Sequence, residues 1–101
     1  MKIFLSHAMS KLTEDEVLSI RKKATRKLKE IYGNDIEIIE NYYHENVPEN
    51  AGQLWHLGRS IQQMEEADLI VFIENHGYSR GCLIEKFIVS IYSLPNTVLH
   101  I

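Results

Sequence analysis

The sequence predicts a single α/β domain: an open, three-layer sheet of four parallel strands with helices on both faces. Two observations lead to this prediction. Short apolar runs alternate with longer segments whose apolar residues recur every three or four positions, in the order βαβαβαβ. The 101 residues also suffice for one hydrophobic core but not for two, so we expect one domain over residues 1–101. For right-handed parallel connections, we expect the flavodoxin-like strand order 2-1-3-4.

The first half of the chain predicts two strands separated by one long helix. Residues 2–6 (KIFLS) and residues 35–40 (DIEIIE) are predicted to form the strands. Thr13 and Glu16 have the spacing of a capping box, which satisfies two backbone amides at a helix start. We expect this helix to span residues 13–32 and to end at the Gly-Asn pair that follows. Its apolar face is predicted to consist of Val17, Ile20, Ala24, Leu28 and Ile31.

The second half predicts two further helices and two further strands. A polar loop at residues 41–50 leads into a helix at residues 51–66. Residues 68–73 (DLIVFI) are almost continuously apolar, which is typical of a strand buried on both faces. A loop at residues 75–81 leads into a third helix that a proline ends, and residues 97–101 form the last strand. The third helix is marked by Leu83, Ile84, Phe87, Ile88 and Ile91.

Composition excludes several classes of protein. A single cysteine, Cys82, excludes an internal disulfide framework and fits a reducing, cytoplasmic setting, where we expect it to pack in the core. No apolar run is long enough to cross a membrane, and the first residues lack a signal-peptide core. Six of the eleven Lys and Arg residues lie between Arg21 and Lys29. Because they interleave with the apolar face of a helix in an acidic chain, we interpret them as a solvated face rather than a nucleic-acid patch.

A binding site is expected at the carboxyl ends of the strands, where the connections diverge to opposite faces of the sheet. The most informative segment there is Ser79-Arg80-Gly81, followed by a helix that contains Glu85. Gly81 permits a tight turn, and Ser79 can cap the helix, whose free amides favour an anion. We expect the helix dipole to lower the pKa of Glu85 and keep it ionised, as a nucleophile or general base. The alternative is that Glu85 only complements the helix dipole.

Segments 1–6, 57–60, 67–72 and 79–85 resemble the nucleoside 2-deoxyribosyltransferase superfamily, most closely its short, largely uncharacterised and often phage-encoded members. The resemblance implies that Glu85 attacks the anomeric carbon of a 2-deoxyribonucleoside and forms a glycosyl-enzyme intermediate. A second base or water then takes the sugar. The implied activity is that of a nucleoside or nucleotide deoxyribosyltransferase or N-glycosidase.

The chain departs from the transferases at two positions where they carry aspartates that bind and protonate the base. Ser60 stands at the first position, and Asn75, beside Glu74, stands at the second. Cleavage of an N-glycosidic bond needs both a nucleophile and a proton for the departing base. We therefore expect Glu74 and His7 as the further catalytic candidates, with His76 a further possible proton donor.

The remaining site residues are expected to bind substrate. Some of the site residues also have a simpler structural interpretation: His7 can merely end the first strand, Arg80 can be an ordinary surface arginine, and a tyrosine after strand 2 can close the core instead of stacking on a base. The predicted substrate-binding set is Ser6, Ser10, Tyr43, Asn75, Ser79, Arg80 and Gly81.

The five histidines show no paired ligand spacing, so we expect no metal and no cofactor. The expected partners are a nucleoside or nucleotide and a second copy of the chain, through the second or third helix. Self-association is expected because only sixteen residues follow Glu85 to close the site. Two other functions stay open. One is a non-catalytic protein that sequesters a nucleotide or a nucleotide-derived signalling molecule; the other is DNA binding through the basic helix.

Overall fold

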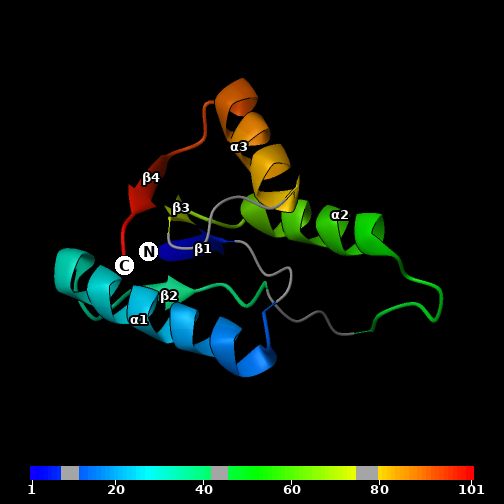
Figure 1. Ribbon diagram of the computed structural model, residues 1–101. Helices are drawn as coiled ribbons and strands as arrows, with labels where there is room; N and C mark the ends of the chain where they lie inside the picture. Colours follow the sequence, from blue (N-terminus) through cyan, green and yellow to red (C-terminus); the bar gives the residue numbers. More distant parts are fainter. Residues whose placement is uncertain (8–11, 42–45, 75–79) are drawn as a thin grey trace.

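The computed structural model has a four-stranded parallel sheet in the order β2-β1-β3-β4, which confirms the predicted fold class and strand order (Figure 1). The structure describes residues 1–7, 12–41, 46–74 and 80–101. The strands are β1 (Lys2–Ser6), β2 (Glu37–Ile38), β3 (Leu69–Ile73) and β4 (Asn96–Leu99). The helices are α1 (Glu14–Tyr32), α2 (Gln53–Met64) and α3 (Arg80–Tyr92). None of the helices in these described ranges is both long and apolar enough to cross a membrane.

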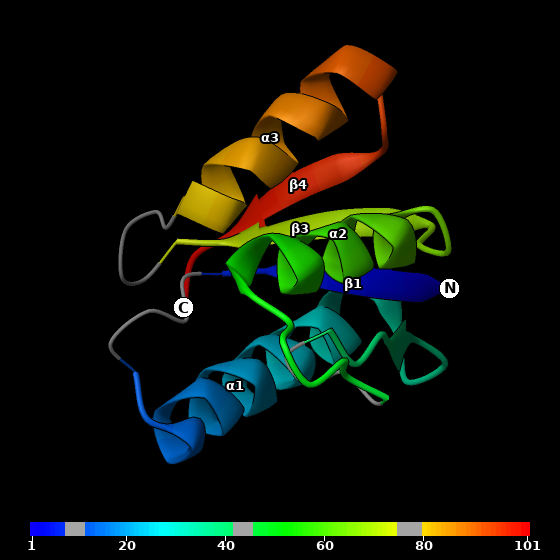
Figure 2. The same ribbon diagram turned by 90° about the vertical axis from the view of Figure 1, so that its right-hand side faces the viewer.

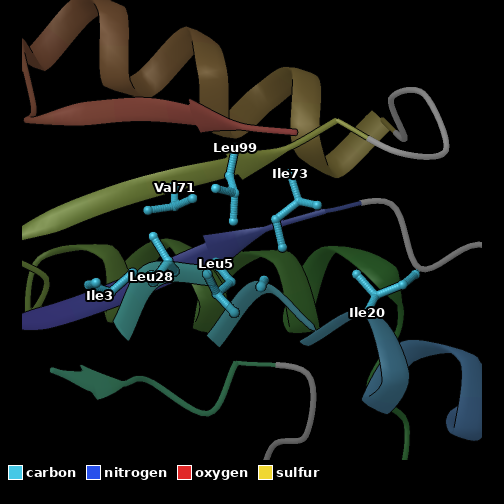
Figure 3. Close-up of a cluster of buried hydrophobic side chains, with 8 residues drawn as sticks. Ile3, Leu5, Ile20, Leu28, Val71, Ile73 and Leu99 are labelled. Carbon is cyan, nitrogen blue, oxygen red and sulfur yellow. The ribbon is translucent and has the colours of Figure 1, made fainter. Parts of the chain in front are cut away.

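The helices form two outer layers around the sheet. α1 covers one face, where its Ile20, Ala24 and Leu28 pack with β-strand residues (Figure 3). α2 and α3 cover the other face and pack on a second cluster (Figure 2). The α1-side cluster consists of Ile3, Leu5, Ile20, Ala24, Leu28, Val71, Ile73 and Leu99. The α2/α3-side cluster consists of Phe4, Ile39, Met64, Ile70, Phe72 and Val89.

Because side chains alternate along β1, successive residues of this strand face opposite helix layers. Ile3 and Leu5 point to the α1 side, and Phe4 points to the α2/α3 side. By the same alternation, Ser6 belongs to the α2/α3 side and His7 to the α1 side. Two consecutive polar residues at the carboxyl end of β1 therefore lie on opposite faces of the sheet.

α1 begins as predicted but buries a different set of residues. The Thr13 hydroxyl accepts a hydrogen bond from the Glu16 amide at 3.2 Å, and the Glu16 carboxylate accepts one from the Thr13 amide at 3.1 Å. Ile31, expected in the core, is 61% exposed, whereas Arg21 is buried. The stripe of buried residues thus ends at Leu28, one turn earlier than the periodicity predicts.

The other boundaries shift by smaller amounts. β2 is shorter than the predicted strand at 35–40, although the Ile39 amide still donates to the Ile3 carbonyl at 2.9 Å. Gly81, expected in a loop, is the second residue of α3. β4 begins at Asn96, one residue before its predicted start, and ends at Leu99. Element ends are set by tertiary pairing, which local sequence patterns do not contain.

We predict that Leu28→Ala lowers the free energy of unfolding by about 2–5 kcal/mol, because it opens a cavity at a position that is 1% exposed. Ile31→Ala, one turn further along the same helix, is expected to change it by no more than about 0.5 kcal/mol. Urea denaturation measures both. Equal losses for the two variants would contradict the packing of α1.

Candidate functional site

Glu85 lies on the inner side of α3, and its carboxyl group is buried at the carboxyl end of the parallel sheet. The Ser6 hydroxyl, at the end of β1, donates a hydrogen bond of 2.8 Å to Glu85 Oε1. The two residues are 79 positions apart in sequence. The sheet topology therefore brings together the predicted nucleophile and one of the predicted substrate-binding residues.

Burial raises the pKa of Glu85 from 4.5 to about 7, and the hydrogen bond from Ser6 lowers it by a smaller amount. The expectation that the helix dipole would lower this pKa is wrong. The dipole acts mainly within the first turn, and Glu85 is the sixth residue of α3. Loss of water around the carboxylate outweighs what remains of the dipole, so near neutral pH the group exchanges a proton readily.

A second polar pair lies on the α1 side of the same strand end. The Arg21 guanidinium is buried and approaches His7 Nε2 through Nη1 at 3.3 Å. Its Nη2 donates to the Ile39 carbonyl at 2.9 Å, which fixes the chain just after β2. Because a guanidinium only donates hydrogen bonds, His7 Nε2 must supply the lone pair at this contact. The tautomer with its hydrogen on Nδ1 satisfies this contact.

Arg21 was assigned by sequence to a solvated basic face, and for this residue the prediction is wrong. Position 21 lies one residue after Ile20 and three before Ala24, so it belongs to the buried stripe of α1. In the sequence, this spacing was the signal that could have distinguished buried Arg21 from the exposed basic residues around it. The other five basic residues of the run are exposed, as predicted: Lys22, Lys23, Arg26, Lys27 and Lys29.

Asn41 closes the same edge of the sheet between β2 and β1. Its side-chain Nδ2 donates to the Leu5 carbonyl at 2.9 Å, which continues the β1–β2 hydrogen-bond ladder beyond the last residue of β2. Its Oδ1 is buried with no hydrogen-bond partner in the part of the chain that the structure describes. The sequence placed Asn41 in a polar loop and gave no sign of this role. A buried amide oxygen of this kind can accept a hydrogen bond from a ligand.

Glu74, the other predicted catalytic carboxylate, follows β3 directly. Its amide donates to the Leu99 carbonyl at 3.0 Å. Its carboxylate lies 4.0 Å from Lys86 Nζ and 3.6 Å from His100 Nδ1, and it is partly exposed. Glu74 therefore belongs to a charged group beside β4, whereas Glu85 lies under α3 against β1.

The predicted binding residues at the start of α3 are only partly described. Arg80 is exposed, and its Nη2 donates to Gln53 Oε1 at 3.0 Å, which ties the first residue of α3 to the first residue of α2. The remaining predicted residues, Ser10, Tyr43, Asn75 and Ser79, lie outside the described residues, as does His76. Within the described ranges, no three His, Cys, Asp or Glu side chains group closely enough to hold a metal ion.

The site thus consists of two polar pairs on the two sides of one strand end, Ser6–Glu85 and His7–Arg21, with Asn41 beside them. A titratable carboxyl, an imidazole and a buried guanidinium are groups that can bind a polar organic ligand and exchange protons with it. Comparison with known proteins yields no matching family model and no matching curated protein.

We predict that Glu85→Gln makes the protein more stable than the wild type at alkaline pH. Glu85 has a higher pKa folded than unfolded, so its contribution to stability is complete below about pH 4.5 and is lost as the pH rises through about 7. From 4.5 to about 7, that loss corresponds to roughly 3 kcal/mol. Glutamine has no proton to lose, and its Oε1 still accepts the Ser6 hydrogen bond.

The measurement is urea unfolding of both proteins from pH 4.5 to pH 8. The stability of Glu85→Gln minus that of the wild type is expected to grow across this range. The same substitution at exposed Glu30 is the control, because it changes charge without touching the buried site. A difference between Glu85→Gln and the wild type that stays constant with pH would contradict the burial of an ionising Glu85.

Proposed function

We propose that this protein binds a nucleoside or nucleotide at the carboxyl ends of β1 and β3 and breaks its N-glycosidic bond, with Glu85 as nucleophile. One observation supports this most: a buried carboxyl group, held by the Ser6 hydroxyl at 2.8 Å, lies where the chain connections diverge to opposite faces of a parallel sheet. The resemblance to the nucleoside 2-deoxyribosyltransferase superfamily agrees with this position of the glutamate. A cytoplasmic setting is part of the proposal, in keeping with the single, buried Cys82.

In the proposed reaction, Glu85 attacks in its ionised form. The Ser6 hydroxyl holds Oε1, which leaves Oε2 to form a bond to the anomeric carbon as the carbon–nitrogen bond breaks. The electron pair of that bond goes to the base, which takes a proton. Water, or the nitrogen of a second base, then attacks the anomeric carbon, and the ester electron pair returns to Glu85. The proton released by the incoming nucleophile restores the acid.

The acid is assigned among the residues near the strand ends. Glu74 follows β3 directly, and its carboxyl group is partly exposed at the edge of the sheet that carries the site. His7 can donate only through Nδ1, because its Nε2 accepts from Arg21. We favour Glu74 as the proton donor and assign the His7–Arg21 pair to substrate binding, where the buried guanidinium favours an anionic group.

A second candidate function is binding without turnover. It is favoured by the raised pKa of Glu85, because near neutral pH a large fraction of the group is an uncharged acid that can donate a hydrogen bond to a ligand. Such a site would sequester a nucleotide, or a signalling molecule derived from one, and release it unchanged.

We predict that the wild type releases free base from at least one member of a panel of 2-deoxynucleosides and their 5′-phosphates, whereas Glu85→Gln loses activity by at least about 100-fold. Activity of the wild type should rise as the pH increases through about 7, because attack requires the ionised carboxylate of Glu85. Chromatographic detection of free base measures both. Glu30→Gln is the matched control and should leave the rate unchanged.

The outcomes separate the two functions. Base release that Glu85→Gln does not diminish would contradict the nucleophile assignment. A ligand that stabilises the protein against heat, and is recovered intact after denaturation with no base released, would support the binding function instead. Absence of both base release and thermal stabilisation across the whole panel would contradict both functions.

A further inference from the structure

α3 carries apolar side chains on both of its sides. Its inner side buries Cys82, Glu85 and Val89 against the sheet. Its outer side exposes large hydrophobic residues, and in Figures 1 and 2 no other described element covers it. These residues are Leu83 (54% exposed), Ile84 (40%), Phe87 (67%) and Ile91 (62%).

The exposed residues form one continuous stripe. Leu83, Phe87 and Ile91 are four positions apart, so they follow one another along the same face of the helix, with Ile84 beside them. The stripe lies opposite the buried residues of α3. A helix that is apolar on all sides is normally buried on all sides, so the outer face of α3 has the composition of a contact surface.

The accessible surface of the chain is larger than its mass predicts. The accessible surface is 6750 Å², whereas a folded monomer of 11.8 kDa exposes about 5,900 Å² by the usual scaling with mass. The excess of about 850 Å² belongs to the chain as a whole, and the exposed hydrophobic residues of α3 contribute to it.

We propose that the outer stripe of α3 is the interface of a dimer, in which α3 packs antiparallel against α3 of a second copy of this chain around a two-fold axis near Phe87. The stripe is symmetric about Phe87, because Leu83 lies four residues before it and Ile91 four residues after it. An antiparallel pair therefore places Leu83 of each copy against Ile91 of the other, and the two Phe87 rings meet at the axis. Such a self-complementary surface is what a two-fold dimer requires.

Charge selects the antiparallel arrangement over the parallel one. Arg80 stands at the start of α3 on the same side as the stripe, where it also bonds Gln53 of α2, and no other charged residue lies on this side of the helix. A parallel pair would place the two Arg80 side chains next to each other. An antiparallel pair instead places each Arg80 near the carboxyl end of the other α3, where the helix dipole favours a cation.

The dimer does not depend on the proposed function, because the stripe faces away from Glu85. It does explain how α3 stays docked although one of its three buried residues ionises near neutral pH. In the dimer, contacts between the outer sides of the two α3 helices add to the few contacts that the inner side of α3 makes with the sheet.

The first experiment measures molar mass by sedimentation equilibrium from low micromolar to submillimolar protein. We expect the wild type to approach twice 11.8 kDa. Phe87→Glu, which brings two carboxylates together at the axis, should weaken the dimer by about thirtyfold or more. Ile91→Ser should weaken it as well, whereas Ile31→Ser, at an equally exposed isoleucine on the opposite layer, should not. A wild type that stays monomeric at all concentrations, or equal effects of Ile91→Ser and Ile31→Ser, would overturn the proposal.

The second experiment tests the antiparallel pairing. Leu83→Glu and Ile91→Lys are each expected to be monomeric alone, because each homodimer would bury unpaired charges. Mixed in equal amounts, they should form a heterodimer, in which the new glutamate faces the new lysine and the native leucine faces the native isoleucine. Circular dichroism of each variant confirms that it is folded. A mixture that remains monomeric while both variants are folded would overturn the antiparallel pairing.

Discussion

The hydrogen bond between Ser6 and Glu85 is the contact on which the chemistry of this fold depends. It joins the end of the central strand β1 to the inner side of α3 in a place from which water is excluded. α3 buries Cys82, Glu85 and Val89, and its partly buried Ile88 packs on the same cluster, so an ionisable group is one of the few residues that attach this helix to the sheet. The protonation state of one carboxyl therefore influences the docking of a helix and, in the function that we propose, the reactivity of the site.

The alternation of side chains along β1 then divides the site into two halves. Ser6 bonds Glu85 on the α3 side, and the next residue, His7, contacts Arg21 on the α1 side. This separation has a physical advantage. A buried cation close to Glu85 would lower the pKa of the carboxyl, whereas here its pKa is about 7 and burial dominates. The strand keeps the acid and the cation on opposite faces while leaving both at one edge of the sheet.

The sequence was enough to predict the strand order and the start of α1, because these follow from apolar periodicity, capping residues and handedness. It also predicted that Ser6 and Glu85 lie at one sheet edge. It could not predict that Glu85 is buried, because burial depends on how α3 is rotated against the sheet, and most of the apolar residues that mark this helix in the sequence are exposed. Arg21 and Asn41 were missed for a related reason: the partners that bury them, His7, Ile39 and Leu5, are distant in sequence.

The most direct test of this account is the pKa of Glu85, measured by carbon-13 NMR of the side-chain carboxyl during a pH titration. The account predicts an apparent pKa near 7 in the wild type. In Ser6→Ala it predicts a still higher value, because the hydrogen bond that stabilises the carboxylate is gone. An apparent pKa near the ordinary value of 4.5 that Ser6→Ala leaves unchanged would contradict the claim that a buried, serine-bonded carboxyl lies at the centre of the site.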